Sequence, residues 1–285
     1  MMKPELTGLS VLTAVCGFYM GSEGTLDLTK MFYTALGTLL VGGAAGTLNQ
    51  YLERDFDLLM RRTERRPLPS GRLKPAAALV FGIGLSFAGL FILRAGVNVM
   101  AYILALVTLL SYLFLYTPMK RKSSLNTLVG AIPGALPALI GWSAANGDIS
   151  APGFVLFGIL FVWQMPHFLS LAWMYRKDYG RAGFKMLPVV DENGTQTGWQ
   201  MIAFSVALLL LSVCLTMLRL TGYVYCGGAV VLSAMFLPPS IRFLQSSVAT
   251  DEEAVVRKNN YSRKVFFWSL AYLPLLMALM VIDKQ

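Results

Sequence analysis

The sequence predicts an all-α, polytopic membrane protein with nine transmembrane helices. Of its 285 residues, 56% are hydrophobic and only 14% are charged, and the mean hydropathy is +0.60. Such a composition excludes an ordinary soluble domain. The apolar residues also gather in nine stretches of about twenty residues, the length that an α-helix needs to cross a bilayer. We therefore expect one integral-membrane domain that covers residues 1–285.

The nine expected helices follow one another along the chain. Too few residues precede the first helix for a transit peptide, so we expect no organellar signal and a location in a bacterial plasma (inner) membrane. Residues 94–97 and 219–222 are short enough to join antiparallel neighbours directly. The expected spans are 6–22, 31–52, 76–94, 98–116, 125–145, 151–174, 199–218, 222–244 and 264–282.

The distribution of positive charge predicts the orientation of these helices. We place the N-terminus and the loops after the second, fourth, sixth and eighth helices on one side of the membrane. That side then holds all of the 24 Lys and Arg residues except Lys30, Arg94, Arg219 and Lys284. Loops rich in Lys and Arg stay in the cytoplasm, so we expect a cytoplasmic N-terminus and an external C-terminus. Topology thus explains the net charge of +9, and no nucleic-acid partner is expected.

Prolines interrupt two of the expected spans. Pro133 and Pro137 lie in the fifth span, and Pro238 and Pro239 lie in the eighth. Kinks at these positions either open an internal cavity or serve packing alone. The cysteines lie in apolar stretches without the spacing of metal ligands, and we interpret all three as packing residues: Cys16, Cys214 and Cys226.

A polar segment follows the second span. If that helix continues to about Met60, then Asn49, Glu53 and Asp57 are four residues apart and share one face, while Asp55 points elsewhere. Carboxylate and amide oxygens are the ligands that Mg²⁺ prefers, together with phosphates of a substrate. Polar groups at the edge of a bilayer are costly and usually functional. This face is therefore a candidate metal site, and a solvated helix end is the alternative.

Two arginines follow the polar face at the same spacing. Arg62 and Arg66 are four residues apart, and their forked donors suit a phosphate group. Cytoplasmic loops are rich in arginine in any case, so a simple topology signal explains these two residues equally well.

A second acidic position follows the sixth span. Asp178 is expected at the mouth of that helix, as Asp57 is at the mouth of the second. Two such mouths on one side of the membrane can share a diphosphate through bridging Mg²⁺. The basic segment Lys120, Arg121 and Lys122 either neutralises the remaining charge or only marks the cytoplasmic side.

The chain contains a single histidine, His167. It precedes Asp178 by eleven residues, which places it about 16 Å deeper in the membrane along a continuous helix. At that depth it can ligate a haem iron, handle a proton, or simply bond to a neighbouring helix.

At these residues the sequence resembles the UbiA superfamily of intramembrane prenyltransferases, and within it the branch that farnesylates haem. The acidic motif alone resembles the whole superfamily, whereas the segments around His167 and Asp178 point to the haem branch. The matching segments are Lys3-Pro4 with Leu6-Thr7, residues 49–57 with Met60, Arg62-Thr63 and residues 66–73, Tyr116-Thr117-Pro118, Lys120-Arg121 with Leu125-Asn126-Thr127, Gly141-Trp142, Trp163-Gln164 with Pro166-His167-Phe168, Asp178-Tyr179 with Met186-Leu187-Pro188, and Ser269 with Tyr272-Leu273.

The resemblance implies nine helices around a central, lipid-accessible cavity, with farnesyl diphosphate and the cofactor Mg²⁺ at its cytoplasmic mouth. Haem B is implied as the second substrate, and its vinyl group would receive the farnesyl group and water to give haem O. The implied users of haem O are terminal oxidases, their assembly pathway, or a haem A synthase. The implied Mg²⁺ ligands are Asn49, Glu53, Asp57 and Asp178, and the implied diphosphate contacts are Arg62, Arg66, Tyr116, Lys120 and Arg121.

The sequence departs from the superfamily pattern at two positions. Glu53 stands where the family usually has Asp, and we expect metal binding to survive this longer arm. Ala182 stands four residues after Asp178, where many members carry a second acid. This departure favours the haem branch, and it leaves Asp191 and Glu192 as weaker candidates for the second metal. The alternatives are a related prenyltransferase that acts on a quinone precursor or a chlorin, and a transporter.

Overall fold

The computed structural model describes residues 2, 4–248 and 252–285, with the side chain of Glu252 excepted. Over these residues the chain is helical and forms no strand, and its one β-bridge pairs Thr221 with Lys284. This confirms the predicted all-α class. The chain divides into two compact units, which are described separately below. The first contains Met1–Met119, Ile132–Phe157 and Arg181–Gly183, and the second contains Lys120–Ala131, Gly158–Gly180 and Phe184–Gln285.

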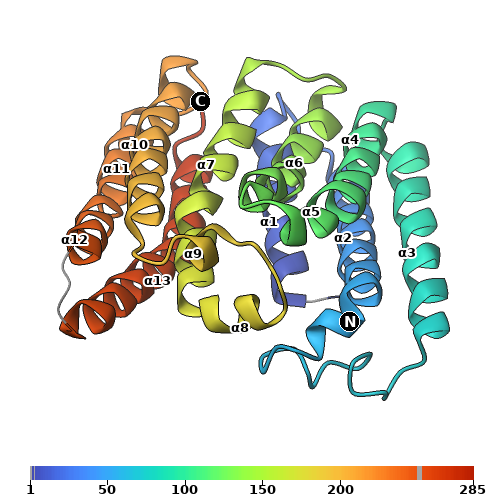
Figure 1. Cartoon of the computed structure of the whole chain (residues 1–285). Coiled ribbons are helices and arrows are strands. Elements are labelled where there is room, and N and C mark those ends of the chain that lie inside the picture. Colours follow the sequence, from blue (N-terminus) through green and yellow to red (C-terminus); the bar gives the residue numbers. More distant parts are fainter. Residues whose placement is uncertain (1, 3, 249–251) are drawn as a thin grey trace. The chain divides into compact units, whose positions relative to one another are not determined.

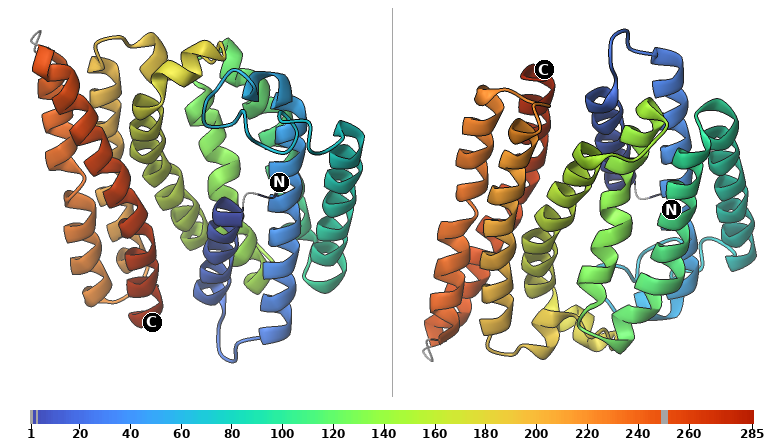
Figure 2. Two further views of the ribbon diagram at one scale, coloured as in Figure 1. Left: turned by 90° about the horizontal axis from the view of Figure 1, so that it is seen from below. Right: turned by 90° about the horizontal axis from the view of Figure 1, so that it is seen from above.

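The first unit is built on a pair of long helices, α2 (Leu28–Asp57) and α3 (Pro75–Gly96), which lie side by side in Figures 1 and 2. Glycine makes this close approach possible, because a Cβ on Gly37 or Gly89 would meet the side chains of the facing helix. The unit also contains α1 (Pro4–Gly21), α4 (Val99–Leu110), a π-helix over Ser111–Tyr116, the start of α5 (Thr117–Lys122) and most of α6 (Asn126–Asn146).

The second unit is centred on aromatic packing at the end of α7 (Ala151–Met174), the helix that carries Trp173. The Trp173 ring meets the Phe243 ring edge-on at 4.9 Å between centroids, and Leu169, Leu187 and Met201 are buried around them. The surrounding helices are α8 (Arg176–Arg181), α9 (Leu187–Val190), α10 (Thr195–Met217), α11 (Tyr223–Ala234), α12 (Leu237–Val248) and α13 (Glu252–Ile282), of which the last four gather in one group (Figure 1).

One of the two proline-containing spans is broken into two helices, and the other is a single helix. The eighth expected span is two helices, α11 and α12, with a break at Met235 and Phe236 just before Pro238. Proline has no amide hydrogen and clashes with the preceding turn, so the break falls where the sequence predicts a kink. The fifth span continues through Pro133 and Pro137 as one helix, α6.

Eight helical segments in the described part of the chain are long and apolar enough to cross a membrane, one of them formed by α4, the π-helix and α5 together and one by α11 and α12 together. They cover Leu28–Asp57, Pro75–Gly96, Val99–Lys122, Asn126–Asn146, Ala151–Met174, Thr195–Met217, Tyr223–Val248 and Glu253–Ile282, and each coincides with an expected span. The first expected span is also helical, as α1, but it does not belong to this set. The chain is therefore a multi-pass membrane protein, while the count of nine spans and the orientation stay predictions.

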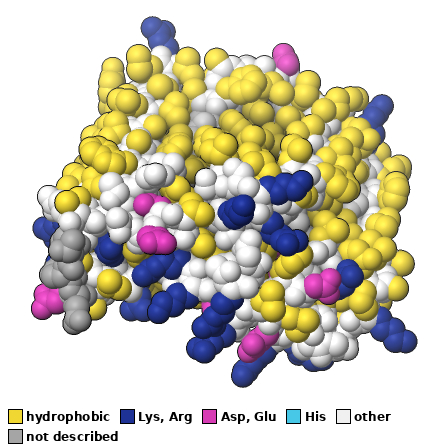
Figure 3. Space-filling model, in the orientation of Figure 1, with side chains coloured by type: hydrophobic (Ala, Val, Ile, Leu, Met, Phe, Trp, Pro, Cys, Tyr) yellow, Lys and Arg dark blue, Asp and Glu magenta, His cyan; other side chains and the backbone are white. Residues whose placement is uncertain are grey.

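The surface of the helices agrees with a lipid environment. Phe87 and Phe91 on α3 are each more than two-thirds exposed, which water would disfavour. Hydrophobic side chains cover much of the face in Figure 3, and most of the Lys and Arg side chains lie in the lower half of that view.

Candidate active site

The end of α2 carries a buried polar face. Asn49 and Asp57 are fully buried and Glu53 is 5% exposed, whereas the side chain of Asp55 is 73% exposed. These exposures confirm that Asn49, Glu53 and Asp57 share one side of the helix and that Asp55 points away. The helix ends at Asp57, three residues before the expected Met60, and the chain turns there.

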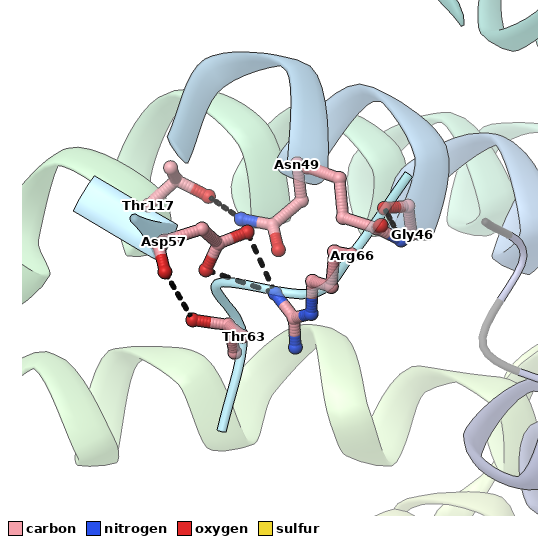
Figure 4. A network of polar contacts seen from close by, with 7 residues as sticks. Gly46, Asn49, Asp57, Thr63, Arg66 and Thr117 are labelled. Atoms are coloured by element: carbon pink, nitrogen blue, oxygen red, sulfur yellow. Dashed lines mark hydrogen bonds and ion pairs between the residues drawn. The ribbon is translucent and has the colours of Figure 1, made fainter. Parts of the chain in front are cut away.

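The loop after α2 folds back over this face. The Arg66 Nη1 atom donates to both carboxylate oxygens of Asp57, at 3.0 and 2.8 Å, and the Thr63 hydroxyl donates to the Asp57 carbonyl at 2.8 Å (Figure 4). Thr63 thereby satisfies a carbonyl that the helix end leaves without an intrahelical partner. The loop thus brings a guanidinium directly onto a buried carboxylate.

A second contact fixes the amide of Asn49. The Asn49 Nδ2 atom lies 3.1 Å from the Thr117 hydroxyl (Figure 4). That hydroxyl donates to the Tyr112 carbonyl at 2.9 Å. A hydroxyl has one hydrogen, so Thr117 accepts from Asn49 and the amide nitrogen must face it. The Asn49 amide oxygen consequently points away from Thr117. Sequence reasoning did not identify Thr117 as a site residue, although the segment Tyr116-Thr117-Pro118 marked its position.

Thr117 follows a π-helical segment, Ser111–Tyr116. The Thr117 amide bonds to the carbonyl of Tyr112, five residues back, and Pro118 has no amide hydrogen with which to continue the α-helical pattern. Within this irregular turn, the centres of the Tyr112 and Tyr116 rings lie 5.4 Å apart. In the same unit, Tyr116 is half-buried and directly precedes Thr117, and Arg62 lies exposed in the loop after α2.

The second unit holds the remaining candidates. Lys120 and Arg121 lie on α5, and the Lys120 side chain is 8% exposed, with its ammonium 5.8 Å from the centre of the Phe184 ring. The Lys120 carbonyl accepts from the Lys185 amide at 2.7 Å. The centre of the Phe184 ring also lies 6.1 Å from the centre of the Tyr179 ring, and Tyr179 directly follows Asp178 in the chain. Arg121 is exposed.

The expectation of one continuous helix from His167 to Asp178 is wrong. Helix α7 ends at Met174, and Asp178 lies half-buried on the separate short helix α8. The Arg176 guanidinium donates to the Trp173 carbonyl at 3.0 Å and to the Asn259 side chain at 3.3 Å. This side chain takes the place of the next helical amide, so the chain leaves the axis of α7. The expected depth of 16 Å between His167 and Asp178 no longer follows.

His167 is held between α7 and α13. Its ring stacks between Trp163 and Phe266, at 5.5 and 5.1 Å between centroids, and its Nδ1 atom lies 2.7 Å from the Ser269 hydroxyl. That hydroxyl donates its hydrogen to the Phe266 carbonyl at 2.5 Å. Nδ1 must therefore carry the hydrogen in its contact with Ser269, and Nε2 carries the lone pair in the neutral ring.

The donor set on α2 fits a magnesium ion that is shared with a phosphate. Asn49, Glu53 and Asp57 offer one amide and two carboxylates, and all three are hard oxygen ligands of the kind that Mg²⁺ takes along with substrate phosphates and water. Over the described residues, no three His, Cys, Asp or Glu side chains group as a metal site.

The two weaker metal candidates lie elsewhere in the second unit. The Asp191 carboxylate accepts from the amide and the hydroxyl of Thr197, both at 2.7 Å, at the start of α10, so a structural role accounts for it. Glu192 is exposed.

Comparisons of the sequence with known proteins agree on one family. The sequence model described as the UbiA prenyltransferase family matches residues 10–271. The chain is 43% identical to the Protoheme IX farnesyltransferase of Solibacter usitatus and 44% identical to that of Salinibacter ruber. Each alignment covers 99% of this chain and 96% of the relative.

Solved structures share the fold at low sequence identity. A UbiA homologue from Aeropyrum pernix K1 in its apo form superposes with a TM-score of 0.73 at 20% identity and covers 99% of this chain and 98% of its own. A UbiA homologue from Archaeoglobus fulgidus, bound to GPP and Mg²⁺, gives 0.63 at 15% identity, covering 96% of this chain and all of the other.

Proposed function

Because this chain belongs to the UbiA prenyltransferase family, we propose that it transfers the farnesyl group of farnesyl diphosphate to a vinyl group of haem B (protohaem IX) to give haem O. The observation that carries the proposal is the similarity to proteins named Protoheme IX farnesyltransferase, at 43% and 44% identity over 99% of the chain. The buried polar face of α2 supports it, because its carboxylates can hold the Mg²⁺ to which the diphosphate of a prenyl donor binds.

We propose that Mg²⁺ is the cofactor. The UbiA homologue from Archaeoglobus fulgidus, which is bound to GPP and Mg²⁺, supports this proposal. Asn49, Glu53 and Asp57 would hold it from α2, and Asp178 would serve a second ion. The ion supplies positive charge against the diphosphate. The role of the protein is to present oxygen ligands in fixed positions, and the Asn49–Thr117 contact provides this for the amide.

The basic side chains would stabilise the charge that grows on the leaving group. When the bond between the first farnesyl carbon and its oxygen breaks, the electron pair departs with the diphosphate. Guanidinium and ammonium groups that are already in position lower the barrier to this step. We assign this role to Arg62 and Arg66 from the α2 loop and to Lys120 and Arg121 from α5. The Tyr116 hydroxyl would face the same diphosphate and donate a hydrogen bond to it.

In the second step of the reaction, the vinyl group of the haem accepts the farnesyl group. The terminal vinyl carbon of the haem forms a bond to the allylic carbon, and the positive charge moves to the inner vinyl carbon. Water adds there and loses a proton, which gives the hydroxyethylfarnesyl group. The site must admit one water at this stage and exclude it earlier, because water would otherwise capture the allylic cation. No side chain forms a covalent intermediate in this scheme.

His167 is our candidate for contact with haem. Its Nε2 atom carries the lone pair in the tautomer that Ser269 imposes, and an imidazole nitrogen with a lone pair can bind a haem iron. The product would serve terminal oxidases, directly or through a haem A synthase. We also assign the chain to a bacterial inner membrane, with the α2 face on the cytoplasmic side.

The test is incubation of the purified protein in nanodiscs with haem B, farnesyl diphosphate and Mg²⁺, followed by mass analysis of the extracted haem. The expected product carries a farnesyl group plus one water, and a chelator abolishes it. Prenylation of a supplied quinol precursor or chlorin, with haem unchanged, would replace the acceptor in this proposal. Uptake of a labelled solute without any product would replace the reaction with transport.

A further inference from the structure

A pocket of about 260 Å³ opens where α11 breaks into α12, against α13. The break shapes it: Pro238 and Pro239 stand on one side, and Tyr261 and Trp268 of α13 stand on the other. The Trp268 indole donates to the carbonyl of Leu232, in the last turn of α11, at 3.1 Å. The aromatic wall is therefore fixed to the broken helix by a hydrogen bond.

Two positive side chains line this pocket, Arg242 of α12 and Lys264 of α13, and both are exposed. The Lys264 ammonium lies 5.4 Å from the centre of the Tyr261 ring. Among the residues that the structure describes, no carboxylate forms an ion pair with either cation. Two cations without an acidic partner at one small pocket favour an anionic occupant.

The depth of these cations in the membrane can be estimated from their distance to the other end of α11 and α13. There the Asp283 carboxylate accepts from the Tyr225 amide at 2.6 Å, so the start of α11 and the end of α13 lie together. Lys264 precedes Ile282 by eighteen residues, or about 27 Å of helix, and Arg242 follows Tyr223 by nineteen. This length is close to the thickness of the hydrocarbon core of a bilayer, about 30 Å, so the charged ends of these two long side chains can extend to the headgroups of the other leaflet.

The surroundings of the pocket suit a lipid tail. Met235, which lines the pocket, is exposed, and so are Ile241 and Phe267, which directly precede the lining residues Arg242 and Trp268 in the chain; Phe267 is 63% exposed. Tyr and Trp, which line the pocket, are the side chains enriched at membrane interfaces. We propose that this pocket binds the phosphate of an anionic phospholipid between Arg242 and Lys264, with an acyl chain against the exposed apolar side chains.

The experiment uses the whole protein, purified in detergent and titrated with phosphatidylglycerol or phosphatidylcholine, and native mass spectrometry counts the bound lipids. We expect phosphatidylglycerol to be retained in preference to phosphatidylcholine. Arg242→Gln and Lys264→Gln should each weaken retention about fivefold, the contribution of one cation near an anionic headgroup. Arg242→Lys should retain the lipid. The matched control is Arg263→Gln, which removes an exposed charge one position away from Lys264 and outside the pocket.

Several results would overturn the assignment. Equal retention of both lipids, or the same loss in Arg263→Gln, would show that no specific headgroup site exists. Displacement of the lipid by inorganic phosphate alone would show a plain anion site, and displacement by equimolar farnesyl diphosphate would assign the pocket to the prenyl donor. Farnesyl transfer, measured on the same variants in phosphatidylcholine nanodiscs, should stay within twofold of the unmodified protein, and its loss would place Arg242 and Lys264 in the reaction instead.

Discussion

The carboxylate of Asp57, with 1% of its side chain exposed, accepts two hydrogen bonds from one nitrogen of Arg66, a residue nine positions later in the chain. The pair joins the end of α2 to the loop that follows it. A buried carboxylate and a guanidinium that both suit the proposed site thus hold each other in place before any substrate arrives. The two residues thus have a structural role and a proposed role in the reaction. Measurements of stability and of activity on the same variants can separate these two roles.

Arg66→Gln should destabilise the protein, because it leaves the Asp57 charge buried without its partner. Breaking a fully buried pair costs about 3 to 5 kcal/mol. The Arg66 side chain is 25% exposed, so solvent reduces the expected loss to about 2 kcal/mol. Thermal unfolding in detergent measures it. The double variant Asp57→Asn with Arg66→Gln should recover most of the loss, since no charge is then unpaired.

The control for this pair is Arg61→Gln, which removes an exposed charge of the same loop. Its midpoint of unfolding should match that of the unmodified protein. If the losses of stability in Asp57→Asn and in Arg66→Gln simply add in the double variant, the two residues do not interact as the structure shows.

Glu53→Gln and Asp57→Asn should each abolish farnesyl transfer while the protein stays folded, since an amide cannot supply the charge that the diphosphate-bound metal needs. Glu53→Asp should keep much of the activity because it shortens the arm without removing the carboxylate. Asp55→Asn is the matched control: it lies on the same turn, its side chain is 73% exposed, and its activity should be unchanged. Full activity in Glu53→Gln or Asp57→Asn would contradict the proposed role of the polar face of α2.

Thr117→Val should release the Asn49 amide, because valine has the same shape but no group that can accept from Nδ2. A neutral hydrogen bond contributes about 0.5 to 1.5 kcal/mol, so we expect activity to fall up to about tenfold. The Mg²⁺ concentration for half-maximal rate should rise, since the amide oxygen loses its fixed direction. Thr117→Ser keeps both hydrogen bonds and should restore the normal Mg²⁺ dependence. A lower thermal midpoint in Thr117→Val, with unchanged Mg²⁺ dependence, would leave Thr117 with a structural role alone.

The sequence predicts those parts of the site that depend on one helix. Asn49, Glu53 and Asp57 recur every four residues, and helical periodicity alone puts them on one face. Contacts between distant segments are a different matter. The Thr117 hydroxyl meets Asn49 across 68 residues, and Asn259 meets Arg176 across 83. No local pattern encodes such pairs. The expected sixth span ends at residue 174, as α7 does, but the sequence did not predict that Asp178 lies on a separate helix, because the contact of Arg176 with Asn259 joins distant segments.

Gly141→Ala should prevent folding of the first unit, because α6 and α1 cross with no room for a side chain there. A Cβ on Gly141 would run into the backbone of Ala14, which cannot move aside as a flexible side chain can. Gly84→Ala is the matched control, since Gly84 lies within α3 with nothing within 4 Å of the added carbon. Alanine favours a helix over glycine by up to about 1 kcal/mol, so this variant should be neutral or slightly more stable. Size-exclusion chromatography and thermal unfolding of both variants in detergent measure the difference. A monodisperse Gly141→Ala protein with an unchanged midpoint would show that α1 and α6 do not approach this closely.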